Sequence, residues 1–212
     1  IRDSRDPRLA MSILTNNVEF KDRTIEAWTG GRDGKGVIHA TRTGYYIYKF
    51  IDPNLDLLQN RTSVHHWVIM RYAEILLSYA EAMNEAYGPT GNVGYRLNAV
   101  RALNQVRNRV GVEMPAVPTA ISKEELREKI RNERRVELAF EDHRFWDVRR
   151  WMIAPETLGT PLRGVEITKI SDEEFEYKPI EVEKRTFEPK MYLYPIPQAD
   201  LNTTGWVQNP LW

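Results

Sequence analysis

The sequence predicts an all-α protein of tetratricopeptide-like helical hairpins, an α/α superhelix with irregular loops and a few short strands. Apolar residues recur at helical spacing from about Val68 to Tyr87 and again from about Asn92 to Val110. A short turn rich in glycine and proline joins the two stretches, so they form an antiparallel hairpin of the size of one tetratricopeptide unit. The unit is visible once, and the sequence alone does not show an array.

The chain divides by texture into three segments. Residues 1–66 form a loop- and strand-rich segment, because glycine is frequent in them and one β-prone run lies at 45–50. Residues 67–152 form the helical core. Residues 153–212 form a loop-rich extended tail, because helical periodicity fades after Pro155 and only loops and short strands are expected there.

Two further helices are predicted in the core segment. Ser122 and Glu125 have the spacing of a capping box, so a third helix begins there and extends to about Phe140. Asp142 can cap a short fourth helix that ends near Trp151.

Composition excludes several classes of function. The chain has 212 residues with 30 basic and 30 acidic side chains and no cysteine. A balanced charge does not attract nucleic acid or anionic membranes, and the lack of cysteine excludes disulfides and thiolate chemistry. No apolar run approaches the roughly 18 residues of a membrane helix. Because the chain begins without methionine or a leader pattern, we interpret it as a fragment of a longer protein.

Glu133 and Glu137 are the sharpest local anomaly, because they lie in the middle of an apolar helical stripe. A carboxylate pair can act in glycoside hydrolysis, but those pairs face each other across a cleft, whereas these residues are one turn apart on one helix. We therefore predict that both glutamates form structural ion pairs, since a buried charge is costly unless it is paired. The candidate partners are Arg101, Arg107, Arg144, Arg149 and Arg150.

No metal, cofactor or nucleophile site is predicted. His143 lies beside two acidic residues, but no histidine has the spacing of a zinc or di-metal motif. No serine lies in a Gly-x-Ser-x-Gly elbow, and the glycines at 30–36 lack the lysine and hydroxyl residue of a phosphate loop.

Aromatic residues in the first segment are the candidates for ligand binding. Trp28 lies beside a glycine pair, and a flat ring on a loop can stack on a sugar face. Tyrosines in a strand also pack structurally, and that alternative stays open. The candidate ligand-binding residues are Trp28, Arg32, Asp33, Tyr45 and Tyr46.

A series of motifs in order along the chain resembles the C-terminal half of the SusD/RagB family. The series consists of Arg5-Asp-Pro-Arg-Leu9, Arg71-Tyr-Ala-Glu74 with the helix that follows it, Leu103-Asn-x-Val-Arg-x-Arg109, Glu125-Leu-Arg-x-x-Ile130, Glu133-Arg-Arg-x-Glu-Leu138, Arg144-x-Trp-Asp-x-Arg-Arg-Trp151, Tyr194-Pro-Ile-Pro197 and Gln208-Asn-Pro210.

The resemblance implies a surface-exposed lipoprotein of the Bacteroidetes outer membrane. Such a protein captures nutrients, usually glycans, and passes them to a SusC-like TonB-dependent transporter; it is not an enzyme. Its lipid anchor would lie in the missing N-terminal part. Two alternatives from other classes stay open: a helical-hairpin module that binds a protein or peptide, and a hydrolase that uses Glu133 and Glu137.

Overall fold

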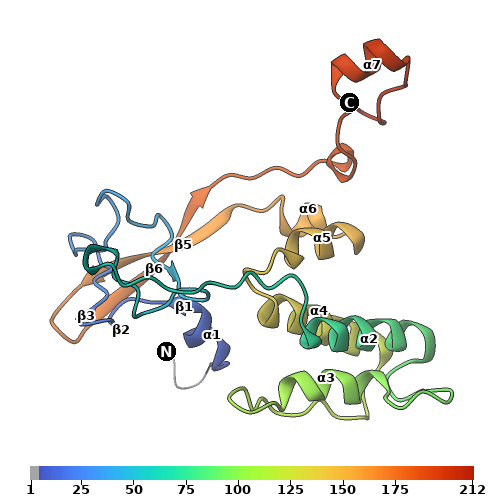
Figure 1. Cartoon of the computed structure of the whole chain (residues 1–212), viewed down its shortest axis with the longest axis horizontal. Coiled ribbons are helices and arrows are strands. Elements are labelled where there is room, and N and C mark those ends of the chain that lie inside the picture. The colour runs from blue at the N-terminus through green and yellow to red at the C-terminus, as the bar shows by residue number, and fades with distance from the viewer. Residues whose placement is uncertain (1–4) are drawn as a thin grey trace. The chain divides into compact units, whose positions relative to one another are not determined.

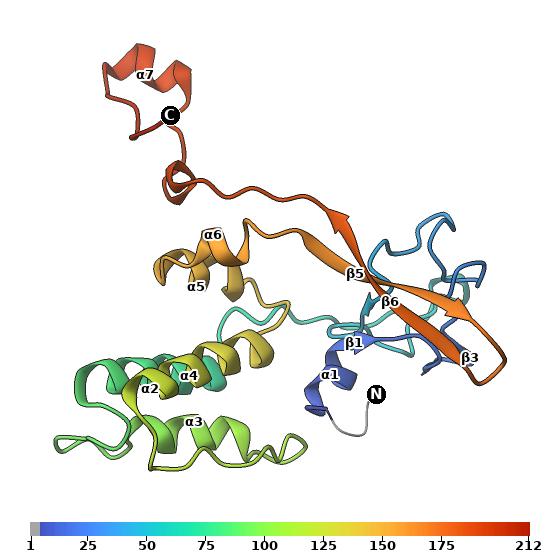
Figure 2. The same cartoon turned by 180° about the vertical axis from the view of Figure 1, so that it is seen from behind.

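A computed structural model describes residues 5–212, so the first four residues of the loop- and strand-rich segment lie outside the described part (Figures 1 and 2). The described chain forms two compact units. The first contains residues 5–25 and Tyr46–Arg144, and the second contains Glu26–Tyr45 and Phe145–Trp212.

The first unit contains four helices, one 3-10 turn and two short strand pairs. Strand β1 pairs with β4 and strand β2 with β3, both antiparallel. The elements are α1 (Arg8–Ser12), β1 (Ile13–Leu14), β2 (Glu19–Phe20), β3 (Arg23–Thr24), β4 (Tyr46–Ile47), η1 (Leu57–Gln59), α2 (Tyr72–Tyr87), α3 (Ala99–Arg107) and α4 (Lys123–Glu137).

Helices α2, α3 and α4 lie side by side in both views (Figures 1 and 2) and enclose the apolar core of this unit. Leu77, Leu103 and Leu126 contribute fully buried side chains, one from each helix. The prediction of a helical hairpin is therefore confirmed for α2 and α3, and α4 packs against both helices.

The hairpin helices are shorter than the periodicity predicted. Helix α3 begins at Ala99 rather than near Asn92, because the Asn98 side chain accepts from the Arg101 N–H and caps it there. Val93 and Gly94 have φ angles of 40° and 87°, which no α-helix contains. The predicted start of the second helix was therefore wrong, and residues 88–98 form a loop.

Helix α4 begins where the sequence predicted. Ser122 accepts a hydrogen bond from the Glu125 N–H, and the Glu125 carboxylate accepts one from the Ser122 N–H, so the capping box is confirmed. The helix ends at Glu137 rather than Phe140, because Phe140 has a left-handed φ of 64°.

Helix α5 (His143–Arg150) begins at the end of the first unit and continues into the second. The second unit also contains α6 (Ala154–Thr157), β5 (Leu162–Lys169), β6 (Phe175–Glu183), η2 (Pro189–Tyr192) and α7 (Gln198–Thr204). Strands β5 and β6 form an antiparallel hairpin of 8 and 9 residues.

This hairpin corrects the prediction of short strands after Pro155. Most side chains on both strands are exposed or half-buried. A two-stranded ribbon with little buried area does not need strict alternation of apolar and polar residues, so the usual strand signal is weak. Gly164 of β5 lies directly against the Thr43 backbone, because a Cβ added to this glycine would lie only 2.7 Å from the Thr43 Cα. Residues 26–45 therefore lie directly along this hairpin.

Side-chain hydrogen bonds hold the last residues of the second unit. The Gln208 amide accepts from the Ile196 N–H at 2.8 Å and donates to the Ile196 carbonyl at 2.9 Å. Asn209 donates to the Tyr194 carbonyl at 2.6 Å, and the Trp212 indole donates to the Leu193 carbonyl at 3.0 Å. The motifs at 194–197 and 208–210 are thus two sides of one clamp.

Among the helices in residues 5–212, none is both long and apolar enough to span a lipid bilayer.

Candidate functional site

Three carboxylates line one side of α4 and the turn after it, four residues apart. Glu133 and Glu137 are 1% and 3% exposed, and Glu141 follows where the chain leaves the helix. Five cations from four other segments converge on them. We call the three glutamates together with Arg8, Lys49, Arg71, Arg107 and Arg109 the carboxylate ladder.

Each buried glutamate has more than one guanidinium partner. Glu133 lies 2.5 Å from the Arg8 Nη1 and 2.6 Å from the Arg107 Nη1. Glu137 lies 2.8 Å from the same Arg8 nitrogen and 2.6 Å from the Nη1 atoms of Arg71 and of Arg109. Charges this deeply buried are tolerated only when they are multiply paired, and here they are.

Glu141 extends the ladder beyond the helix. Its carboxylate lies 2.7 Å from the Arg71 Nε and 2.5 Å from the Lys49 Nζ. The same Lys49 ammonium donates to the carbonyls of Glu137 and Ala139, which lack helical partners at the C-terminus of α4. Lys49 therefore both pairs with the ladder and caps the helix.

Two of the ladder carboxylates, those of Glu137 and Glu141, are poor proton donors. Burial raises the pKa of Glu137, but hydrogen bonds from Arg109, Arg8 and Arg71 outweigh it and lower this pKa to about 2. Burial also raises the pKa of Glu141, and Arg71 and Lys49 lower it below its ordinary value. A general acid in glycoside hydrolysis needs a raised pKa, and these two groups have the opposite.

Most arginines that pair with Glu133 and Glu137 are not those proposed as partners from the sequence. Arg107 was among those candidates and pairs with Glu133, whereas Arg8, Arg71 and Arg109 were not. Arg150 lies in the second unit and pairs with Asp147 on its own helix at 2.8 Å. Arg144 stands at the first turn of α5.

Arg149, another of those candidates, anchors the second unit. It donates to the carbonyls of Met191 at 2.5 Å and of Tyr192, and it lies over the rings of Phe145 and Tyr194.

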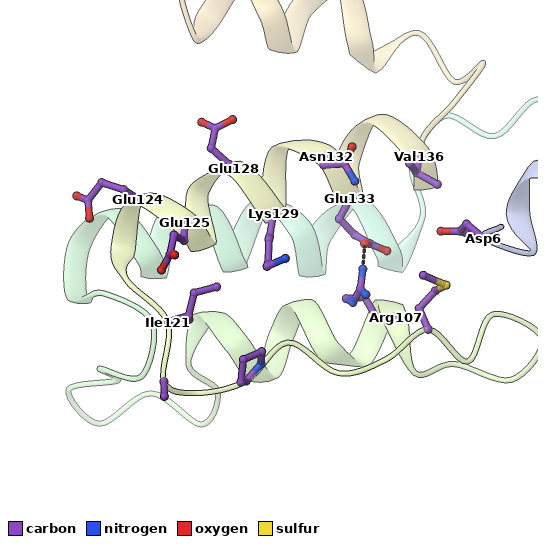
Figure 3. A pocket seen from close by; sticks show the side chains of 13 residues that line it. Asp6, Arg107, Ile121, Glu124, Glu125, Glu128, Lys129, Asn132, Glu133 and Val136 are labelled. Carbon is purple, nitrogen blue, oxygen red and sulfur yellow. Dashed lines mark hydrogen bonds and ion pairs between the residues drawn. The ribbon is translucent and has the colours of Figure 1, made fainter. Parts of the chain in front are cut away.

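A groove of about 1020 Å³ runs between α4 and the linker that follows α3. Figure 3 shows Lys129 and Glu133 in it, with the dashed contact from Glu133 to Arg107. Polar and apolar side chains share its walls: Asp6, Arg107, Met114, Pro118, Ala120, Ile121, Glu124, Glu125, Glu128, Lys129, Asn132, Glu133 and Val136.

The predicted ligand-binding residues Trp28, Arg32 and Asp33 lie on one loop of the second unit. The Trp28 ring is half-buried, with the Phe175 ring at 5.4 Å and the Lys169 ammonium at 5.0 Å. The Asp33 carboxylate accepts from the Glu26 N–H, and Arg32 is exposed. One side of Trp28 is therefore occupied by the protein itself.

The two predicted tyrosines fall in different units. Tyr45 is 44% exposed and belongs to the second unit. Tyr46 lies in β4 of the first unit, opposite Leu14 of β1. The structure thus gives Tyr46 a strand position, in keeping with the packing alternative for these residues.

The sequence did not predict an aromatic pair formed by the last residue of α2 and a residue of the loop that follows it. The Tyr87 and Tyr95 rings lie 6.1 Å apart at an angle of 38°, and both are exposed. Because the second helix was predicted to begin near Asn92, Tyr95 was placed inside a helix. The glycines at 88, 91 and 94 were the available signal that a loop continues to Asn98.

Within residues 5–212, no group of histidine, aspartate and glutamate side chains has the geometry to hold a metal ion.

Comparison with known proteins shows which family the chain resembles in sequence and in structure. The SusD family model matches residues 1–212. A SusD-like protein from Bacteroides fragilis is 33% identical, covers 99% of this chain and superposes with a TM-score of 0.79, while this chain covers 40% of it. A SusD-like carbohydrate binding protein from the same species is 32% identical and superposes with a TM-score of 0.75. The match covers 94% of this chain and 41% of that protein's chain.

The SusD-like protein P2 of Formosa agariphila is 34% identical over 120 residues, which is 54% of this chain and 22% of that protein. This chain thus spans about a fifth of that relative and about two fifths of the solved structures. The match extends over every described element, from α1 to the clamp at the C-terminus. The chain belongs to the SusD family.

Proposed function

We propose that this chain is part of a glycan-binding protein that captures polysaccharide or oligosaccharide at the cell surface and passes it to a SusC-like TonB-dependent transporter. Membership of the SusD family over residues 1–212 carries the proposal. A relative of similar fold and 32% identity is described as a carbohydrate binding protein, which supports sugar as the ligand class. The proposed location is the outer membrane, with a lipid anchor outside these residues.

The proposed function is binding without catalysis. If the protein were a hydrolase, Glu133 and Glu137 would be its candidate catalytic carboxylates. Both are paired with arginines, and they are only 1% and 3% exposed. Neither side chain is accessible to a substrate, and the pKa of Glu137 is lowered to about 2, whereas the acid of a glycosidase needs a raised pKa.

We propose Trp28, Arg32, Asp33, Tyr45 and Tyr46 as ligand-binding residues. Arg32 is the sharpest of these to test, because its side chain is exposed and has no partner side chain within residues 5–212. Arg32→Ala should therefore change ligand affinity without unfolding the second unit. Arg135→Ala is a matched control, since Arg135 is also exposed and lies on α4 of the first unit.

A native-gel retardation screen tests the function. The gels carry soluble starch, laminarin, xylan or alginate, and the chain should be slowed by at least one of them. Arg32→Ala should weaken that retardation about tenfold or more, as expected for a contact residue, and Arg135→Ala should not. If none of the polysaccharides slows the wild-type chain, the proposal fails.

Transfer to a transporter has its own test. A tagged full-length protein, expressed with the TonB-dependent transporter of its own gene cluster, should co-purify with that transporter after detergent extraction. The unrelated transporter of another cluster is the control. Equal recovery of both would contradict a dedicated partner.

A second candidate function is that of a protein- or peptide-binding module. The observation in its favour is the groove beside α4, whose lining combines apolar side chains with more acidic than basic ones and so suits an extended basic peptide. This alternative predicts blank polysaccharide gels together with binding of a basic peptide set. Reversal of charge at the exposed Glu124 by Glu124→Lys should then abolish peptide binding.

A further inference from the structure

Two exposed tyrosines lie close together where α2 ends: Tyr87 is the last residue of the helix, and Tyr95 lies in the loop that leads to α3. Tyr87 is 42% exposed and Tyr95 is 52% exposed, although the two rings lie only 6.1 Å apart. An aromatic pair that packs on itself yet leaves this much ring uncovered is a platform on which a flat apolar face can stack.

Unpaired polar groups stand beside this platform. Arg96 follows Tyr95 directly and Asn92 precedes it in the same turn; both are exposed. Within residues 5–212 neither side chain has a hydrogen-bond or ion-pair partner. Residues 86–98 contain no aspartate or glutamate, so the Arg96 guanidinium is free to donate in a planar fork to hydroxyl or carboxylate oxygens.

The loop is held in place at both ends. The Gly88 N–H donates to the Asn84 carbonyl at 3.0 Å, and the Val100 N–H donates to the Pro89 carbonyl at 3.2 Å. The Tyr79 hydroxyl donates to the Leu97 carbonyl at 2.8 Å. Between these anchors the Tyr95 N–H donates to the Asn92 carbonyl at 2.7 Å. A platform fixed before binding loses less entropy when a ligand is ordered on it.

We propose that Tyr87 and Tyr95 bind a pyranose ring of a glycan, with Asn92 and Arg96 hydrogen-bonding its ring substituents. The C–H groups on one face of a sugar carry partial positive charge and meet the negative face of an aromatic ring, while the hydroxyls at the edge need polar partners. The platform and its polar neighbours supply both. This site rests on the proposed glycan-binding function and adds a second set of binding residues, which belong to the first unit, whereas Trp28 belongs to the second.

The test uses Tyr95→Ala, Tyr95→Phe and Arg96→Ala in the same polysaccharide gels. Starch and laminarin serve as neutral probes and alginate as the uronate probe. Tyr95→Ala should weaken binding about tenfold or more, Tyr95→Phe should keep it because the ring remains, and Arg96→Ala should weaken it. A greater loss for alginate than for the neutral probes assigns the Arg96 contact to a carboxylate. An equal loss assigns that contact to hydroxyls.

Tyr72→Ala is the matched control, because Tyr72 lies at the other end of α2 and is 69% exposed. It should leave binding unchanged. Wild-type retardation that persists undiminished in Tyr95→Ala overturns this site and leaves the proposed function standing. Loss of binding in Tyr72→Ala to the same degree also overturns it. If no probe slows the wild-type chain, the site and the proposed function fall together.

Discussion

Replacing Glu137 by glutamine removes the negative charge at the centre of the carboxylate ladder and keeps the size of the side chain. Three guanidinium groups, those of Arg8, Arg71 and Arg109, lie within 2.6 to 2.8 Å of this carboxylate. Without it, Arg109 loses the ion pair that the structure gives it, and Arg8 and Arg71 each lose one of theirs.

The size of the effect follows from the pKa of the carboxylate. A pKa of about 2, against an ordinary 4.5, corresponds to about 3 kcal/mol of additional interaction with the folded protein. The Glu137 side chain is 1% exposed, so solvent screens this interaction little. Breaking one partner of a buried pair costs about 3 to 5 kcal/mol in other proteins, which agrees.

Thermal unfolding followed by circular dichroism measures this loss. We expect Glu137→Gln to lower the Tm by about 6 to 12 °C at pH 7, given the usual scaling for a chain of this size. Glu128→Gln is the matched control on the same helix, because Glu128 is 70% exposed and forms an exposed pair with Arg131 at 3.1 Å. Exposed pairs of this kind contribute about 0 to 1 kcal/mol. If Glu137→Gln lowers the Tm no more than Glu128→Gln does, the carboxylate ladder does not stabilise the fold.

The folded-state pKa of Glu137, about 2, lies below its ordinary 4.5, so the unfolded chain takes up the proton first as the pH falls. The stability that the ladder contributes is therefore complete above about pH 5 and is lost towards about pH 2. Urea unfolding across this range should show a steep fall in the free energy of unfolding of the wild type and a shallower fall for Glu137→Gln. Parallel curves would contradict this assignment. Gln208→Ala removes both side-chain bonds to Ile196, so amide exchange at Ile196 should speed up about tenfold or more, whereas Gln198→Ala, which removes only an exposed contact to Asn202, should leave it unchanged.

The parts of the fold that depend on nearby residues could be predicted from the sequence. The start of α4 is one, because Ser122 and Glu125 cap it through hydrogen bonds that span three residues. The burial of Glu133 and Glu137 is another, because both lie on the apolar stripe with Leu126 and Ile130.

The partners of those glutamates could not be predicted in the same way. Arg8 is 125 residues from Glu133, and Arg71 is 66 residues from Glu137. Helical periodicity carries no information about contacts at such separations, and an arginine at the start of a short helix, such as Arg8, or just before a helix, such as Arg71, has no distinct local signal. Only short strands were predicted after Pro155, and the length of β5 and β6 was not, because their largely solvent-exposed side chains need little apolar alternation.

The exposed pair of Tyr87 and Tyr95 was not predicted, because the second helix was predicted to begin near Asn92 rather than at Ala99. Leu97 and Val100 continued an apolar stripe, and that stripe outweighed the three glycines before it. The positive φ angles of Val93 and Gly94 exclude a helix at these residues, and Tyr95 is exposed in the loop that forms instead.

Isothermal titration calorimetry with a polysaccharide that retards the chain measures binding and turnover in one sample. We predict a saturating binding isotherm with no sustained heat flow after each injection, because the carboxylates suited to hydrolysis are held in the ladder. The result should be the same after prolonged incubation, with no new reducing ends. A steady heat of turnover that disappears in a folded Glu137→Gln variant, or the absence of any saturable heat, would contradict a glycan-binding scaffold.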